Sequence, residues 1–179
     1  MTADRSVEAT AAMTMGGMIK LVRDIEMLGG IASKAELLRL GHNADTIRLF
    51  ADHGGLIRRI RKGWYCTPQL EPEVFEAFRV GGRLACVSAA AFHGLVPPLA
   101  TNELHIALNR QSSRLRTRTH PRTRLSSDPD PDLVLHWTRD RLTGTRKAVS
   151  AETAIAQMTL CLSLQRVVRP AGRCRRDNL

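Results

Sequence analysis

Apolar side chains in the first third of the chain recur at the three- and four-residue spacing of amphipathic helices. The first such stripe consists of Met18, Leu21, Val22, Ile25 and Leu28. It ends at Gly29-Gly30, where a glycine pair favours the end of a helix. Two short helices cannot bury their apolar faces alone, so we expect this helix to support the next two in a three-helix core.

A second helix is predicted to begin at Ser33. Ser33 stands three residues before Glu36, so its hydroxyl and the carboxylate can each accept a hydrogen bond from the other residue's backbone amide. Gly41 follows the last apolar residue of this helix, and Asn43 is suited to cap the next one. Residues 40–43 are therefore predicted to form a tight turn between two helices.

The helix after this turn is predicted to have one buried face and one polar outer face. Ile47, Phe50 and Ala51 recur at helical spacing and should point inward. The outer positions are Ala44, Asp45, Arg48 and Asp52. This outer face is a candidate for reading DNA bases.

A short basic hairpin is predicted after the glycine pair at residues 54–55. Residues 56–60 and 64–66 have the composition of strands, and Pro68 ends the second strand. The basic side chains of the hairpin are Arg58, Arg59, Arg61 and Lys62. Such a hairpin can lie along a sugar–phosphate backbone. Helix, turn, helix and basic hairpin together have the order of a winged helix-turn-helix.

Trp64 and Tyr65 on this hairpin allow two interpretations. An exposed ring could stack on a base, whereas a buried ring would anchor the hairpin to the helices. We favour the anchoring role.

The following residues predict a smaller mixed module. A helix is expected over 71–80, with Pro72 in its first turn, and Ser88 is expected to cap a short helix. Alternating apolar residues predict two half-buried strands over 104–109 and 133–137. Ser150 then caps a helix that should pack on these strands. Its predicted inward face comprises Ala154, Ile155, Met158, Cys161 and Leu162.

The sequence thus predicts an α+β protein made of two folded parts between two flexible ends. The predicted parts are a disordered leader (1–17), a winged helix-turn-helix (18–68), a mixed α/β module (69–164) and a basic flexible tail (165–179).

The 179 residues include 27 Lys and Arg against 17 Asp and Glu, which gives a formal net charge of +10. This charge favours polyanions, because each phosphate that a Lys or Arg neutralises releases condensed counterions. Nucleic acid is therefore the expected partner. The alternative is that the charge only keeps the protein soluble, since net charge concerns association rather than fold.

The four cysteines indicate neither a zinc ribbon nor a disulfide framework, because they lie far apart and form no CxxC pair. They are Cys66, Cys86, Cys161 and Cys174. We expect them to be reduced in a cytoplasmic protein. No apolar run reaches the about 18 residues of a membrane span, and residues 1–14 lack the apolar core of a signal peptide. No membrane contact and no cofactor are expected.

The most basic stretch of the chain lies between the two predicted strands and contains few apolar residues. Its arginines are Arg110, Arg114, Arg116, Arg118, Arg122 and Arg124. Two interpretations stay open: a second surface that contacts phosphates, or an exposed loop without a binding role.

Two candidate metal sites are weak. The first would be a three-histidine site, but His105 and His136 alternate onto the outer faces of the predicted strands, and His93 is in a context where a histidine packs or caps a helix. The second is the acidic run 128–132, whose prolines hold its carboxylates apart. We expect no metal site. Nor do the residues form a convergent nucleophile, base and electrophile, so no catalytic residue and no enzyme activity are predicted.

Several segments of this chain, in their order and spacing, resemble the AbiEi-type antitoxins of type IV toxin–antitoxin systems in actinobacteria and their phages. The resemblance covers about residues 18–162. It rests on GGIASKAELLRLGHNADTIR, LIRRIRKGWYCTP, RVGGRLACVSAAAFHGL, LHIALN and LVLHW. It implies a winged helix that binds inverted repeats in its own promoter, and a second region that counters a nucleotidyltransferase-like toxin. Longer relatives continue further, so we expect a C-terminally truncated member.

We therefore predict sequence-specific binding of double-stranded DNA by a transcriptional repressor of the antitoxin or phage-regulator type, as a monomer or weak dimer. The expected base contacts are Ala44, Asp45, Thr46 and Arg48. The expected backbone contacts are Lys34, Asn43, Arg58, Arg59, Arg61 and Lys62. The alternative is a protein-binding module that holds a toxin or a host factor. A third hypothesis is the remnant of a nuclease-associated protein.

Overall fold

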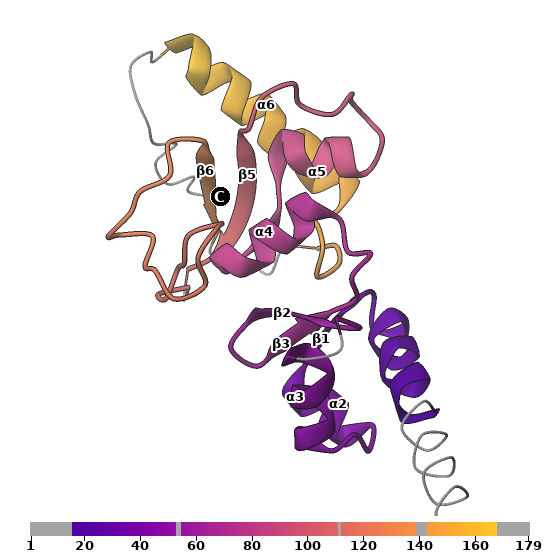
Figure 1. The fold of residues 1–179 in the computed structure, drawn as a ribbon. Helices are drawn as coiled ribbons and strands as arrows, with labels where there is room; N and C mark the ends of the chain where they lie inside the picture. Colours follow the sequence, from indigo (N-terminus) through magenta and orange to yellow (C-terminus); the bar gives the residue numbers. More distant parts are fainter. Residues whose placement is uncertain (1–15, 53–54, 111, 139–142, 168–179) are drawn as a thin grey trace, which may run out of the picture. The chain divides into compact units, whose positions relative to one another are not determined.

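The computed structural model describes residues 16–52, 55–110, 112–138 and 143–167, except for the side chains of 162–167. The chain is α+β and divides into two units, Met1–Leu70 and Glu71–Leu179 (Figure 1). Each unit has its own three-stranded sheet. Most of the predicted leader and tail lies outside the described residues, although 16–17 and 165–167 belong to helices.

The first unit combines three helical segments with an antiparallel sheet of strand order β1-β3-β2. Its elements are a helix over residues 16–27, β1 (Ile31–Ser33), α2 (Lys34–Arg39), α3 (Ala44–Asp52), β2 (Arg58–Arg61) and β3 (Trp64–Cys66). Strands β2 and β3 form the predicted hairpin, with a register irregularity between Arg59 and Arg61.

The predicted helix boundaries in this unit are confirmed by their hydrogen bonds. The Glu36 amide donates to Ser33 Oγ (3.2 Å), and the Ser33 amide donates to Glu36 Oε2 (2.9 Å), which is a complete capping box. At the start of α3, the Asp45 amide donates to Asn43 Oδ1 (2.7 Å). Gly41 lies between the helices with a φ of 86°, a conformation that glycine adopts without strain.

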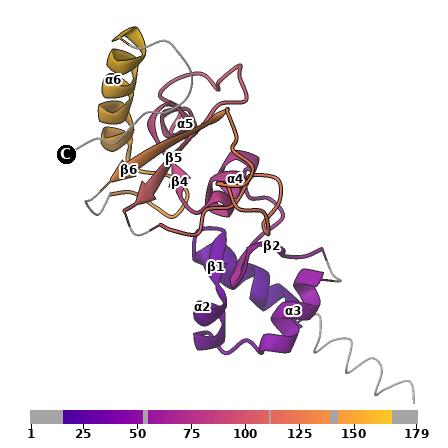
Figure 2. The same cartoon turned by 90° about the vertical axis from the view of Figure 1, so that its left-hand side faces the viewer.

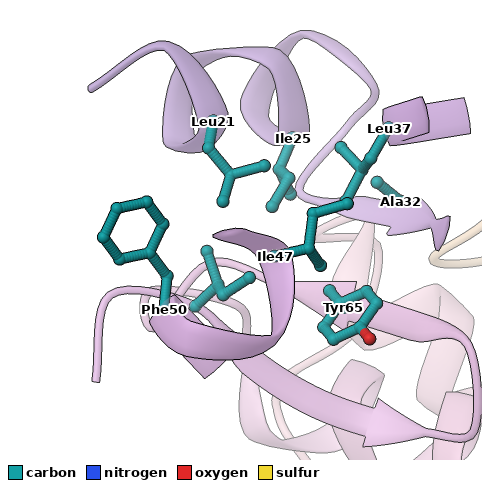
Figure 3. Close-up of a cluster of buried hydrophobic side chains, with 8 residues drawn as sticks. Leu21, Ile25, Ala32, Leu37, Ile47, Phe50 and Tyr65 are labelled. Atoms are coloured by element: carbon teal, nitrogen blue, oxygen red, sulfur yellow. The ribbon is translucent and has the colours of Figure 1, made fainter. Parts of the chain in front are cut away.

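The core of the first unit lies where the helices meet the sheet. Figure 3 shows Leu21, Leu37, Ile47 and Phe50 pointing toward one another, with the Tyr65 ring from β3 beside them. Met18, Val22, Leu28 and Ala51 pack against this cluster, so the apolar stripes predicted from the sequence face inward.

A buried polar contact holds the turn between α2 and α3. Asp24 Oδ2 lies 2.7 Å from His42 Nε2 and accepts a hydrogen bond from Lys20 Nζ at 2.8 Å. Lys20 Nζ also donates to the Leu40 carbonyl (3.0 Å). Asp24 and His42 are both buried. The helix over 16–27 is therefore tied to the turn that sets the direction of α3.

We expect Asp24→Asn to destabilise the first unit by about 1–3 kcal/mol at neutral pH, because a charged hydrogen-bond acceptor is lost. The hydrogen bond from Lys20, and then that with His42, hold the pKa of Asp24 below its ordinary value of 3.8, although burial acts in the opposite direction. The stabilisation is therefore fully present above pH 3.8 and is lost as the pH falls through the lower pKa of the folded state.

Urea unfolding of both proteins from pH 7 down to the lowest pH at which the wild type stays folded, well below pH 3.8, checks this expectation, with Glu26→Gln on the exposed side of the same helix as the control. The difference in unfolding free energy between the wild type and Asp24→Asn should shrink toward the acid end. A difference that does not change with pH would show that Asp24 stabilises the fold by packing alone.

The second unit places helices around a sheet of strand order β4-β5-β6. Its elements are α4 (Pro72–Val80), β4 (Arg83–Leu84), α5 (Cys86–Phe92), β5 (Leu104–Asn109), β6 (Leu133–Thr138) and α6 (Ala151–Val167). β4 is antiparallel to β5, and β6 is parallel to β5. Figures 1 and 2 show β5 and β6 side by side, with α5 near α6.

Strand β5 is not half-buried as predicted. Every residue from Leu104 to Leu108 is buried, because β5 is the central strand of its sheet and helices α4 and α5 both contact it. The predicted cap at Ser88 is also wrong, because α5 already begins at Cys86. The Ser88 hydroxyl instead accepts a hydrogen bond from the His105 amide (3.0 Å).

Helix α6 begins where the sequence predicts, since the Thr153 amide donates to Ser150 Oγ (3.3 Å). Its inward face is only partly as predicted. Ala154 and Cys161 are buried, but Ile155 is 53% exposed. None of the helices in the described part of the chain is long and apolar enough to cross a membrane.

Candidate functional sites

The outer face of α3 carries the residues predicted to contact bases. Asp45 and Arg48 are exposed, and Ala44 and Thr46 are partly exposed. Asn43 is exposed and caps the helix through its side chain. The structure therefore places all the predicted base-contact residues on one short helix whose opposite side is fixed in the core.

The basic side chains of the β2–β3 hairpin differ in whether they lie over an aromatic ring. Arg58 and Lys62 are exposed. The guanidinium groups of Arg59 and Arg61 lie over the rings of Tyr65 and Trp64, at 5.8 and 5.7 Å from the ring centroids. Tyr65 is buried and Trp64 partly so, which confirms the anchoring role for the tyrosine.

Besides the packing of Tyr65, polar contacts connect the hairpin to the helices of the first unit. Arg59 Nη2 lies 3.4 Å from Asp52 Oδ1 at the end of α3. The Lys34 amide at the start of α2 donates to the Gly63 carbonyl in the hairpin turn (2.8 Å), and the Lys34 side chain is exposed. The predicted backbone contacts Lys34, Arg59 and Lys62 thus belong to connected elements.

The arginine-rich stretch of the second unit is not uniformly solvated. Arg110, Arg114, Arg122 and Arg124 are exposed, and Arg116 is partly exposed. Arg118 is different, because its side chain is only 16% exposed and makes a two-pronged ion pair with Asp130. Asp132 and Glu76 also lie within ion-pair distance of Arg118. The acidic run therefore holds an arginine in place, and Arg118 does not belong to an exposed basic surface.

Four potential metal ligands converge in the interior of the second unit: Cys86, His105, His136 and Cys161. We call this group the Cys/His cluster. All four residues are buried, and their ligand atoms lie within 4.8 Å of one another. His105 Nδ1 is 3.1 Å from His136 Nε2, and the two rings are stacked. The prediction that both histidines lie on outer strand faces is wrong.

The pairing of β5 and β6 explains why the two histidines meet. In this parallel pair His105 is opposite Val134, and His136 is opposite Ala107. The two histidines are therefore diagonal neighbours on one face of the sheet. Cys86 at the start of α5 and Cys161 on α6 complete the cluster.

Hydrogen bonds hold the backbone around the cluster. The Cys86 amide donates to Gln157 Oε1 (3.0 Å), so α6 contributes both Cys161 and the group that orients Cys86. The bond from the His105 amide to Ser88 Oγ ties β5 to α5 in the same region. Three elements that are distant in sequence are thereby linked at one point.

Cys161 is electrostatically suited to be a thiolate. Hydrogen bonds from Cys86 and then from His105 lower the pKa of the Cys161 thiol to about 4, although burial acts in the opposite direction. A thiolate is the form in which cysteine binds a metal. His93 is not part of this group, since its Nε2 lies 2.7 Å from the Val149 carbonyl oxygen.

Sequence reasoning missed the cluster because it looked for short spacings. The four residues lie far apart in sequence, and only the sheet pairing and the packing of α6 bring them together. The available signal was that LACVS, LHIALN and LVLHW, together with the apolar stripe containing Cys161, each hold one cysteine or histidine among apolar residues. Cys174 lies outside the described residues. No protein-family model matches the chain, and no curated protein matches it.

Proposed function

We propose that the first unit is a winged helix-turn-helix that binds double-stranded DNA, with α3 in the major groove and the β2–β3 hairpin as the wing. The observation that carries this proposal is the joining of two surfaces in one unit. The exposed side of α3 presents Arg48, and the basic hairpin is attached to the end of the same helix through Arg59 and Asp52.

The proposal assigns different tasks to the two surfaces. Arg48 is exposed on α3, where a guanidinium can form a bidentate pair with guanine. The hairpin cations and Lys34 contact phosphates, which fix the register of the protein on the duplex without reading sequence. The net charge of +10 favours association with a polyanion in general.

The resemblance to AbiEi-type antitoxins adds a biological role to this proposal. The protein is a non-catalytic repressor that binds inverted repeats upstream of its own gene in the cytoplasm. It binds either as a weak dimer across the two half-sites or as two monomers, one on each half-site. A toxin or other protein partner of the second unit is the alternative function.

Binding of the full chain to its own upstream DNA and to a scrambled duplex of equal length, each at two salt concentrations, tests the proposal. A preference for the upstream DNA that persists at the higher salt supports a sequence-specific regulator. Equal binding to both duplexes that is lost together as salt rises contradicts it, because phosphate contacts alone behave in this way. A co-purifying protein that survives high salt would favour the alternative.

Arg48→Ala is expected to remove about 1–3 kcal/mol of discrimination between the upstream and the scrambled duplex, because one bidentate base contact is lost. Binding to the scrambled duplex should change much less. Competition binding with labelled upstream DNA measures the ratio of the two affinities directly.

Arg23→Ala serves as the matched control, since Arg23 is an exposed arginine on the helix over 16–27, outside α3 and the hairpin. It should leave the affinity ratio unchanged. If Arg48→Ala also preserves the ratio while hairpin variants abolish it, the assignment of α3 as the base-reading helix is wrong.

A further inference from the structure

We propose that the Cys/His cluster of the second unit binds one zinc ion, with Cys86, His105, His136 and Cys161 as its four ligands. This site is separate from the DNA-binding function proposed for the first unit. It assigns a role to four buried residues that DNA binding does not use.

The spacing of the ligand atoms fits a tetrahedral ion. Zinc bonds of about 2.3 Å to sulfur and about 2.0–2.1 Å to nitrogen place two nitrogens about 3.3 Å apart and two sulfurs about 3.8 Å apart. The His105 Nδ1 to His136 Nε2 distance is 3.1 Å, and all four ligand atoms lie within 4.8 Å of one another. Only small shifts separate this arrangement from a coordinated one.

The chemistry of the ligand set selects zinc. Two thiolates with two imidazoles in a tetrahedral arrangement are typical of structural zinc sites, whereas magnesium and calcium require oxygen ligands. Four protein ligands fill the coordination sphere, and all four residues are buried. A catalytic zinc keeps an open position for water, so this site is structural.

The surroundings of the cluster have the features of a constructed site. Cys86 has a φ of 48°, a left-handed conformation that is rare for a residue other than glycine. Strain of this kind persists where the surrounding structure imposes it, as at ligand-binding residues. The Cys86 amide is held by Gln157, and the His105 amide by Ser88, so hydrogen bonds outside the ligand set orient two of the ligands.

The zinc ion would connect the elements of the second unit. Cys86 comes from α5, the two histidines come from β5 and β6, and Cys161 comes from α6. Helices α5 and α6 contact each other, and their buried residues include the small side chains of Ala89, Ala90 and Ala154. A metal at this point would compensate for the little apolar area that small side chains bury.

The first test is the zinc content of the full-length protein, produced with zinc in the medium and purified under reducing conditions without a chelator. We expect about one zinc per chain. Cys161→Ser and His136→Asn should each lose stoichiometric zinc on dialysis. Cys66→Ala and His120→Asn are the controls, since Cys66 is buried in the first unit and His120 is exposed in the second. Both controls should keep the metal.

A second test does not depend on whether the ligand variants fold. Wild-type protein stripped of metal is titrated with cobalt(II), and the visible absorption of a tetrahedral cobalt–thiolate centre is expected to saturate at one equivalent and to disappear on addition of zinc. Gln157→Ala should keep this spectrum at saturation but weaken zinc binding about 10–100-fold in competition with a chelator. The reason is that Gln157 positions Cys86 through its backbone amide and does not itself contact the metal.

The proposal is overturned if folded, reduced wild-type protein carries well under one zinc and gives no tetrahedral cobalt spectrum. It is equally overturned if Cys86 and Cys161 are joined by a disulfide in protein purified under reducing conditions. Neither result would affect the DNA-binding experiments on the first unit.

Discussion

Replacing Arg58, Arg59, Arg61 and Lys62 by glutamine is expected to weaken binding to duplex DNA about 1,000-fold at 0.15 M salt. Each cation that neutralises a phosphate lowers the slope of log affinity against log salt by about 0.9, and four such contacts between 1 M and 0.15 M salt account for this factor. The loss should be equal for upstream and scrambled duplexes, since phosphate contacts carry no sequence information. Titrations at several salt concentrations measure both the affinity and the slope.

The chain offers a matched control for this variant. Glutamine at the four exposed positions Arg110, Arg114, Arg122 and Arg124 removes the same charge from the second unit. If the hairpin is the phosphate-contacting surface, the control variant should lose far less affinity and keep most of the salt slope. An equal loss in both variants would mean that net charge, or a second basic surface, accounts for the binding.

The hairpin variant should remain folded. The pair between Arg59 and Asp52 is about half exposed, with side-chain exposures of 45% and 42%, and such pairs contribute at most about 1 kcal/mol. A thermal unfolding curve close to that of the wild type would therefore be needed before the loss of affinity is assigned to phosphate contacts.

Ile47→Ala is expected to lower the free energy of unfolding of the first unit by about 2–5 kcal/mol, because Ile47 is fully buried and its truncation leaves a cavity among Leu21, Leu37 and Phe50. A unit of this size rarely has more than about 3–5 kcal/mol of stability from one apolar core, so the variant should be largely unfolded near physiological temperature. The DNA binding proposed for α3 should then be lost, although none of the proposed contact residues has been changed.

A tryptophan reporter can measure the unfolding of the first unit separately from that of the second unit. Trp64 and Trp137 are the two tryptophans of the chain, one in each unit. In a Trp137→Phe background, urea unfolding followed by fluorescence reports on the first unit alone. Leu49→Ala on the same helix is the control, since Leu49 is 51% exposed and its loss should change stability by no more than about 0.5 kcal/mol. Equal destabilisation by both substitutions would contradict the orientation of α3.

The features predicted correctly from the sequence depend on neighbours along the chain. The Ser33–Glu36 capping box, the Asn43 cap and the inward face of Ile47 and Phe50 each involve residues within one or two helical turns. Local hydrogen bonding and the period of the helix are enough to specify them. The α+β class followed from the same patterns.

The features that were missed depend on which segments meet in space. Periodicity indicated that His105 and His136 belong to strands, but it could not show that β5 is central and parallel to β6. That arrangement turns the histidines inward and brings the two cysteines to them. For the same reason periodicity does not reveal the buried pair of Asp24 and His42, which joins a helix to a distant turn.

The position of Cys161 on α6 also affects the order in which the protein is completed during synthesis. The first unit ends at Leu70, whereas Cys161 follows 91 residues later. At the usual rate of about 5–20 residues per second, the ribosome needs roughly 5–20 s to make this interval. During that time the first unit can already be folded, whereas the Cys/His cluster still lacks Cys161. The emerging chain would thus complete the unit proposed to contact DNA before the interior of its second unit can close.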